Sequence, residues 1–200
     1  MSAYPEDKAL TKIVRIKNLH RKVKLNIRVA QATDWASIQK IVLTAFSEEE
    51  NKVIVKLVAD LFSEASRSPI RHLVAEIDNQ AIGYVAYSPI YLEADVSLTG
   101  YILSPLAVSP EHQHGGVGSS LVKSGIEILS KATVDVLLVY GDPKYYERFG
   151  FEKESACSFV PPYPLEYPFG WLGMMLNGVD APKSPIKFEC VQSLNKSELW

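Results

Sequence analysis

A glycine-rich turn over residues 113–119 is the part of this sequence best suited to chemistry. The apolar run Leu106-Ala107-Val108 precedes the turn, and a predicted helix begins near Gly116. Glycine adopts positive φ angles easily and places no Cβ between the peptide and a ligand. The start of a helix adds unpaired N–H groups and the positive end of the helix dipole. The sequence therefore predicts a pyrophosphate site at this turn.

The spacing of the glycines distinguishes between the known phosphate-binding loops. A dinucleotide fingerprint needs Gly or Ala at the sixth position counted from Gly116, where this sequence has Leu121. A P-loop needs a Gly-Lys-Ser/Thr ending, which does not occur. The turn instead reads Gln113-x-x-Gly116-x-Gly118, which resembles the acetyl-CoA motif of the GNAT N-acetyltransferases. Such a short pattern also fits a plain turn before a helix.

A second motif lies about thirty residues downstream, as expected for the same family. The buried-looking strand 134–140 leads to a short helix that begins at Pro143 and stops at Gly150. Tyr146 to Phe151 reads Tyr-x-x-x-Gly-Phe, which resembles the second half of the GNAT cofactor site. The segment is similar in particular to the bacterial YhbS-type branch of the family. The resemblance covers roughly residues 25–190.

The resemblance implies a role for each residue of these motifs. Backbone groups of Leu106, Ala107 and Val108 would pair with the pantetheine arm of acetyl-CoA like an added strand, and the same residues could also be plain core. The diphosphate would be held by the N–H groups of Gln113, His114, Gly115, Gly116, Val117, Gly118 and Ser119. Tyr146 would be catalytic and would protonate the departing thiolate, because phenol and thiol pKa values are close enough to share a proton. Tyr145 and Tyr146 could instead be packing aromatics.

The general base is not identified by the sequence. Many relatives place a carboxylate on the strand that here reads Tyr101-Ile102-Leu103-Ser104-Pro105, which has none. The residues that could accept protons share no distinctive spacing; they are His72, Glu93, Asp95 and Asp142. Each also fits a surface or capping role, and Asp142 before Pro143 is a natural helix N-cap.

No metal is expected at the turn. His112 and His114 are two residues apart, but no third ligand has suitable spacing, so phosphate contact or solvent exposure fits them better. Cys157 and Cys190 also lack metal spacing and are interpreted as reduced packing residues of a cytoplasmic protein, with a disulfide between them as the alternative.

Composition and periodicity predict an α+β domain. With 200 residues and 47% hydrophobic residues, the chain can bury a full core. The expected order is strand, two helices, three antiparallel-type strands, helix, strand, helix, strand. This order matches a GNAT-like mixed, mostly antiparallel sheet with helices on both faces. Expected elements include a helix opened by residues 47–50, strands near 151–160 and 186–191, and an ordered loop over 161–171 covering one end of the sheet.

Residues 25–200 are therefore expected to form a single GNAT-like acetyltransferase domain behind a basic N-terminal tail, residues 1–24. The tail is a solvated segment or a contact for acidic partners or a dimer neighbour. The net charge of -2 argues against a nucleic-acid partner, and no apolar run is long enough to span a membrane. A homodimer is possible.

The function implied by the resemblance is direct acetyl transfer from acetyl-CoA to an amine of a small molecule or protein. A catalytically weak acyl-CoA-binding sensor module stays open because of the missing carboxylate, and so does a nucleotide-phosphate binder. The acceptor is expected to be selected by residues 46–62 and 161–171. The aromatics of the second segment either line that pocket or form core or dimer contacts; they are Tyr163, Tyr167, Phe169 and Trp171.

Overall fold

The computed structural model describes residues 24–93 and 97–200, so the basic segment of residues 1–23 and Asp95 lie outside the described residues. A mixed sheet runs through the centre of the molecule in the order β1-β2-β3-β4-β5-β7, and β8 joins it by pairing with β3 and with β6. The strands are β1 (Asn26–Val29), β2 (Arg71–Ile77), β3 (Gln80–Leu92), β4 (Gly100–Val108), β5 (Val136–Tyr140), β6 (Phe159–Val160), β7 (Trp171–Met175) and β8 (Ile186–Cys190).

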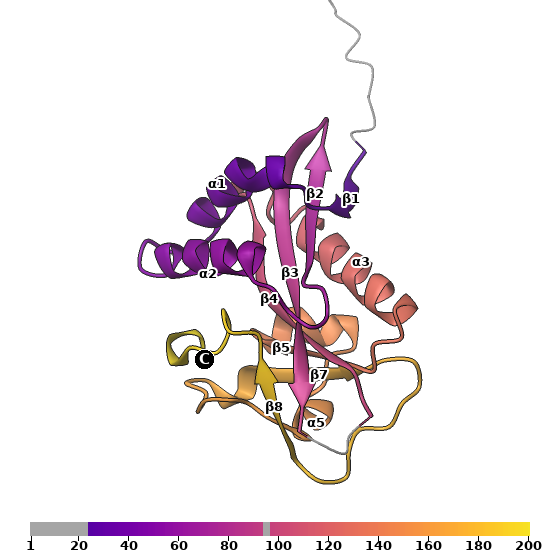
Figure 1. Ribbon diagram of the computed structural model, residues 1–200. Coiled ribbons are helices and arrows are strands. Elements are labelled where there is room, and N and C mark those ends of the chain that lie inside the picture. Colours follow the sequence, from indigo (N-terminus) through magenta and orange to yellow (C-terminus); the bar gives the residue numbers. More distant parts are fainter. Residues whose placement is uncertain (1–23, 94–96) are drawn as a thin grey trace, which may run out of the picture.

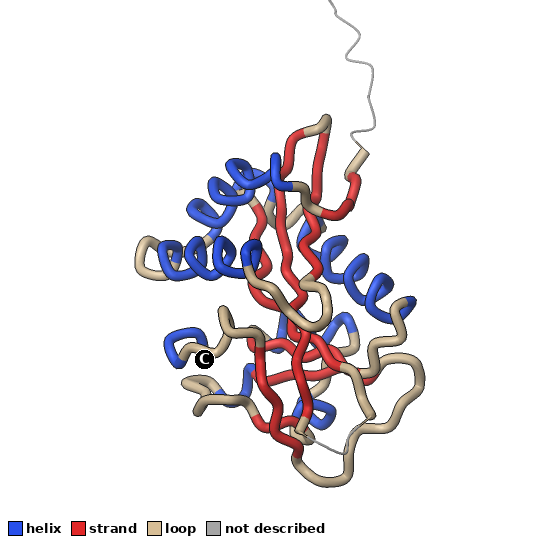
Figure 2. Tube along the Cα trace, in the orientation of Figure 1, coloured by secondary structure: helices blue, strands red, loops and turns tan. Residues whose placement is uncertain are grey.

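Helices cover both faces of this sheet, as predicted. Figure 1 shows α1 and α2 on one side and α3 on the other, and Figure 2 shows the same layering of blue helices around red strands. Neighbouring strand residues alternate between the two cores, so that Val74 and Tyr84 face α1 and α2 whereas Leu73 and Val85 face α3. The helices are α1 (Trp35–Ala45), α2 (Asn51–Ser63), α3 (Val117–Lys131), α4 (Pro143–Tyr146) and α5 (Lys153–Ala156).

The sheet opens between β4 and β5. These two parallel strands pair only from Gly100 and Val136 to Leu103 and Val139, whereas β4 continues along β3 as far as Val108. The pairing register of β3 and β4 shifts at Pro105. Proline has no N–H to give to a ladder and is found at such irregularities. The second half of β4 therefore has a strand partner on one side only.

Two local predictions were wrong. Residues 151–160 do not form one strand, because the helix formers Lys153 to Ala156 make the short α5 and only Phe159–Val160 is extended. The acidic residues 48–50 precede α2 and do not form its first turn; the helix starts at Asn51. At the start of α1, the Asp34 carboxylate is paired with Arg28 at 2.7 Å and accepts the N–H of Gln31.

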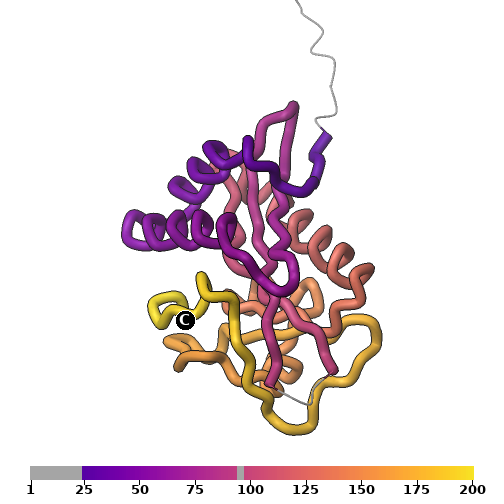
Figure 3. Tube along the Cα trace, in the orientation of Figure 1, coloured from indigo at the N-terminus to yellow at the C-terminus, as the bar shows by residue number. Residues whose placement is uncertain are grey.

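The C-terminal segment returns to the N-terminal helices. Figure 3 shows the end of the chain, coloured yellow, beside α2. The Glu64 carboxylate, just after α2, accepts the backbone N–H groups of Gln192 (2.5 Å) and Ser193 (2.9 Å). Lys196 forms an ion pair with Asp60 of α2 at 2.8 Å. These contacts hold residues 192–200 against α2.

Candidate active site

A cavity of about 480 Å³ lies where β4 separates from β5, and it is called the β4 cavity below. Four segments contribute to it: the end of α1, the end of β4, the glycine-rich turn with the start of α3, and the α4 region. The lining residues are Ala45, Phe46, Leu106, Ala107, Val108, Gln113, His114, Gly116, Gly118, Ser119, Tyr145 and Arg148.

Most of the predicted cofactor residues are brought together here. Gly115 and Val117 are the two that do not line the cavity. Val117 is only 5% exposed and packs into the core beneath α3, so its side chain has a structural role. The backbone N–H of Val117 still belongs to the first turn of α3 and remains available there.

The end of β4 offers a free backbone edge, although one residue fewer contributes than predicted. Ser109 donates its N–H to the Ile82 carbonyl at 2.9 Å, and the same register places Ala107 opposite Tyr84. Antiparallel pairs alternate between hydrogen-bonded and non-bonded, so the backbone groups of Ala107 are used by β3. Those of Leu106 and Val108 point the other way, into the opening between the strands.

Gln113 has a different role from the one predicted. Its backbone N–H donates to the Pro110 carbonyl within a 3-10 turn at 3.3 Å, so this N–H is already occupied. Its side-chain amide Nε2 donates to the Val108 carbonyl oxygen at 3.0 Å. Gln113 thus ties the glycine-rich turn to the last residue of β4, a contact that spacing alone does not reveal.

The turn itself has the geometry of an anion cradle. Gly116 is the N-cap of α3 and has a φ of 84°, a conformation that favours glycine. His114 also has a positive φ, of 60°. The Gly116 carbonyl accepts the N–H of Ser120 at 2.9 Å, which leaves the N–H groups of Val117, Gly118 and Ser119 without intrahelical acceptors.

Arg148 adds a positive charge to this cradle. Its guanidinium donates to Ser119 Oγ at 3.2 Å and lies 4.1 Å from the centre of the Tyr145 ring. Within residues 24–93 and 97–200, no carboxylate forms an ion pair with Arg148. Sequence reasoning did not single out Arg148, although it stands inside the Tyr-x-x-x-Gly-Phe motif. An exposed cation beside unpaired N–H groups suits an anionic ligand.

The two neighbouring tyrosines occupy different environments. Tyr145 lines the β4 cavity, and its Oη lies 2.5 Å from the point where a Cβ on Gly118 would stand. Tyr146 is 9% exposed, and its ring packs edge-on against Tyr145 and Phe151. Gly141 allows this packing, since a Cβ there would lie 2.6 Å from the Tyr146 ring.

Tyr146 itself is not among the residues that line the β4 cavity. Burial raises the pKa of Tyr146, so the phenol keeps its proton at neutral pH. The catalytic role of Tyr146 stays a prediction.

Of the suggested general bases, His72, Glu93 and Asp142 do not line the β4 cavity, and Asp95 lies outside the described residues. Asp142 caps α4 as predicted, because its Oδ1 accepts the Lys144 N–H at 3.0 Å. His72 stacks on Phe62 with ring centres 4.1 Å apart, and its Nδ1 lies 2.7 Å from Tyr84 Oη. Burial lowers the pKa of His72 to about 4, so its ring is neutral and part of the core. Glu93 borders a different hollow.

A second cavity, of about 520 Å³, lies beside the C-terminal segment and is called the C-terminal cavity below. The α1–α2 connection borders both cavities, with Phe46 in one and Glu50 in the other. Asp142 lines the C-terminal cavity, three residues before Tyr145 of the β4 cavity. Its lining residues are Glu50, Tyr140, Gly141, Asp142, Glu166, Tyr167, Phe169, Gly170, Glu198, Leu199 and Trp200.

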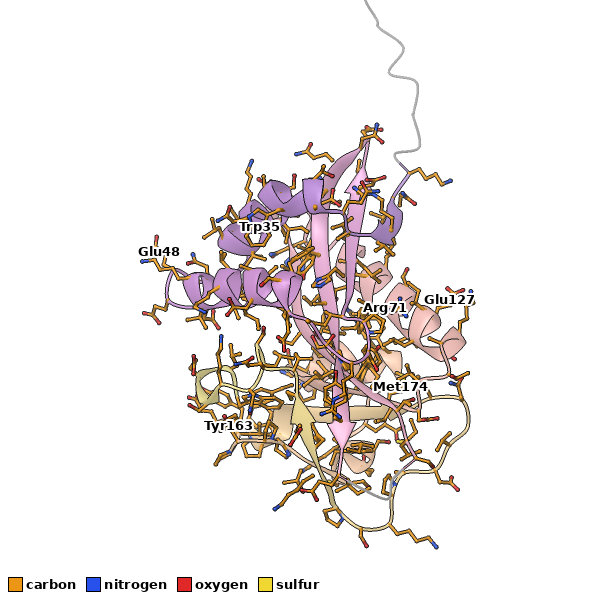
Figure 4. All side chains as sticks on the ribbon, viewed as in Figure 1. Trp35, Glu48, Arg71, Glu127, Tyr163 and Met174 are labelled. Carbon is orange, nitrogen blue, oxygen red and sulfur yellow. The ribbon has the colours of Figure 1, made fainter. Side chains whose placement is uncertain are left out.

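The four aromatics of the proline-rich loop have three different environments. Trp171 is 6% exposed and donates its Nε1–H to the carbonyls of Ala156 and Phe159, so it belongs to the core. Tyr163, labelled in Figure 4, donates its hydroxyl to the Asn195 carbonyl at 3.3 Å. Tyr167 and Phe169 line the C-terminal cavity.

The described residues contain two free cysteines and no cluster of metal-binding side chains. No group of three or more His, Cys, Asp or Glu side chains there could hold a metal ion. None of the helices in the described ranges is long and apolar enough to cross a membrane. Cys157 is exposed and Cys190 is buried, and both are free thiols.

Comparisons with known proteins agree with this architecture. Residues 68–153 match the model of the acetyltransferase (GNAT) domain. The uncharacterized N-acetyltransferase YjhQ of Escherichia coli is 36% identical over 92 residues, which are 46% of this chain and 49% of YjhQ. The uncharacterized N-acetyltransferase YhbS of Escherichia coli is 37% identical over 76 residues, 38% of this chain and 44% of YhbS. The chain thus aligns with about half the length of these curated relatives.

Solved structures extend the similarity to most of the chain. The crystal structure of Escherichia coli YhbS in complex with CoA has a TM-score of 0.70 at 26% identity and covers 87% of this chain and 93% of its own. A GNAT acetyltransferase from Brucella melitensis in complex with acetyl-CoA has a TM-score of 0.60 at 25% identity. It covers 82% of this chain and 94% of its own. With the open β4–β5 edge and the glycine cradle in place, the chain has the GNAT fold of these structures, and its residues 68–153 match the GNAT acetyltransferase domain.

Proposed function

We propose that this chain is an acetyl-CoA-dependent N-acetyltransferase that transfers the acetyl group directly to an amine of a small molecule or protein. The observation that carries the proposal is the convergence, in one cavity, of a free β4 edge with an anion cradle. The CoA and acetyl-CoA complexes of the two similar structures support the same donor.

The residues of the β4 cavity fit both ends of the donor. The phosphates would be held by the N–H groups at the start of α3 and by Arg148. The amide-containing pantetheine arm would lie along β4, because Leu106 presents an unpaired backbone N–H and carbonyl and Val108 an unpaired N–H, as a strand edge does. A cofactor that is extended at one end and anionic at the other matches this layout.

Bound acetyl-CoA supplies a thioester carbonyl that an unprotonated amine can attack, forming a C–N bond and breaking the C–S bond. The free N–H groups of Leu106 and Val108 are available to stabilise charge on the carbonyl oxygen. Tyr146 holds a proton that it can donate, as a hydrogen bond or fully, to the departing sulfur. No carboxylate among the described residues lines the β4 cavity, so the proton that the amine loses passes to solvent water or to the His114 imidazole in the lining.

Release of free thiol from acetyl-CoA with a panel of amines tests the proposal. The expected result is thiol release that requires both the protein and an amine, with mass spectrometry showing the acetylated amine. Tight acetyl-CoA binding without thiol release for any small amine or lysyl peptide would contradict the enzyme proposal and leave a binding module.

A further inference from the structure

The C-terminal cavity combines acidic and aromatic side chains. Four carboxylate residues and four aromatic residues line it, and none of its lining residues is Lys, Arg or His. Tyr167 is 53% and Phe169 61% exposed, and their rings meet edge-on with centres 5.8 Å apart. Exposed aromatic faces beside carboxylates attract organic cations through both charge and the ring quadrupole. This lining therefore differs from the cationic β4 cavity.

Two of the carboxylates form no ion pair within the described residues, although Glu166 lies beside the Tyr167 hydroxyl and Glu198 interacts at longer range with the charge of Lys56. Asp142 is occupied by the α4 N-terminus, and Glu50 accepts a hydrogen bond from Ser47 Oγ at 2.7 Å. Glu166 and Glu198 form no ion pair with any basic residue in the described part of the chain. The nearest cations of the C-terminal wall, Lys56 and Lys196, are each paired with Asp60 at 2.8 Å.

The walls of the cavity are held in place by specific bonds. The Tyr140 hydroxyl accepts the backbone N–H of Tyr167 at 2.8 Å, and the Gly170 carbonyl accepts the N–H of Gly141 at 2.9 Å. Trp200 donates its Nε1–H to the Leu194 carbonyl at 2.9 Å, on the segment that Glu64 fixes to α2. The cavity is thus built from the end of β5, the proline-rich loop and the C-terminal segment together.

The position of the cavity relates it to the proposed reaction. It begins at the carboxyl end of β5, whereas the β4 cavity follows the end of β4, and these are the two strands that separate. Phe46 of the β4 cavity and Glu50 of the C-terminal cavity lie on one connection, and Tyr145 of the first cavity lies three residues after Asp142 of the second. The two cavities are therefore neighbours, each at the end of one of the two separating strands.

We infer that the C-terminal cavity binds the acceptor, and that the acceptor is an aliphatic amine carrying a second cationic group that Glu166, Glu198 and the Tyr167–Phe169 pair recognise. This inference rests on the proposed function. The second group stays charged at neutral pH, because alkyl ammonium groups have pKa values near that of lysine. The size of the cavity suits a small molecule or one extended side chain.

Two acceptors of equal length test the inference. Pentylamine and 1,5-diaminopentane differ by one terminal ammonium group. A short peptide with two lysines is the third acceptor, and it tests whether the preferred dicationic acceptor is a small molecule or a polypeptide. Calorimetric binding to the CoA-loaded protein and kcat/KM for acetyl transfer are both measured. We expect the diamine or the dilysyl peptide to exceed pentylamine by about tenfold or more in both readouts.

A matched pair of variants assigns the effect to the cavity. Glu166→Gln combined with Glu198→Gln should reduce the preference for the second charge to about threefold or less. Glu48→Gln combined with Glu49→Gln removes the same two charges from the α1–α2 connection, where Figure 4 shows Glu48 pointing away from the sheet, and should leave the preference unchanged.

The outcomes separate the two proposals. Equal use of both amines, or a preference that survives the double substitution, would overturn the inference while acetyl transfer itself stands. Charge-dependent diamine binding without any thiol release would support the C-terminal cavity as a site for dicationic amines and would contradict the proposed enzyme activity.

Discussion

The guanidinium of Arg148 lies over the ring of Tyr145, 4.1 Å from its centre, and reaches Ser119 at the start of α3. This stack joins the helix after β5 to the helix after β4 across the mouth of the β4 cavity. The two sequence motifs, which are about thirty residues apart, are therefore linked directly at the place where the phosphates of the donor are expected.

Arg148→Gln should weaken acetyl-CoA binding by about tenfold, because a charge-assisted bond to a phosphate contributes about 1.5–3 kcal/mol, less where it is exposed. The loss should shrink as salt rises, since salt screens exposed charges. Titration calorimetry at low and high ionic strength measures both effects. Arg67→Gln is the matched control, because Arg67 lies over the Tyr91 ring at 4.6 Å and outside the cavity. Equal losses in the two variants would argue against a phosphate contact by Arg148.

Tyr146→Phe should lower kcat by at least about tenfold with little change in acetyl-CoA affinity, because general acid catalysis contributes about 100- to 10,000-fold. The ring contacts with Phe151 survive this change, so the melting temperature should stay near that of the wild type. Tyr145→Phe is the comparison, and it should weaken acetyl-CoA binding more than it lowers kcat, since Tyr145 lines the cavity. Steady-state kinetics on both variants decides the roles, and an undiminished kcat in Tyr146→Phe would remove Tyr146 from catalysis.

His72 should make the fold less stable in mild acid. Burial lowers its folded pKa to about 4, whereas an unfolded histidine titrates near 6.5. Between these values the unfolded chain binds more protons, so stabilisation is complete above about pH 6.5 and is lost as the pH falls toward 4. The loss at pH 4.5 should be about 2 kcal/mol after allowance for partial exposure.

Urea denaturation at pH 7.5 and pH 4.5 measures this loss. In His72→Gln the difference between the two pH values should be smaller by most of that amount, although the variant is less stable at pH 7.5 because the contacts with Phe62 and Tyr84 are altered. The same pH difference in both proteins would show that other groups cause the acid sensitivity.

Much of the fold follows from local rules in the sequence. The strand alternation at Leu73 and Val74, the turn at Asp78 and Asn79 with positive φ angles, and the glycine cap of α3 each depend on residues close in the chain. Such features are set by side-chain direction and backbone sterics, which a single segment determines.

The remaining features depend on contacts between distant segments. Ala107 loses its free backbone groups because of the register with Tyr84, and Arg148 acquires its role by reaching Ser119. The C-terminal cavity combines β5 with residues 166–170 and 198–200, which no periodicity connects. The prediction of one strand over residues 151–160 was wrong because the buried Phe151 and Phe159 lie on either side of a short helix.

The most direct test of the account is titration of acetyl-CoA into the wild-type protein and into Gly118→Val. A Cβ on Gly118 would stand 2.5 Å from Tyr145 Oη, within the anion cradle. We expect one acetyl-CoA per chain for the wild type and a loss of at least about tenfold in affinity for the variant, with circular dichroism showing that both are folded. Unchanged affinity in a folded Gly118→Val protein, or no binding to the wild type, would contradict the assignment of the β4 cavity as the acetyl-CoA site.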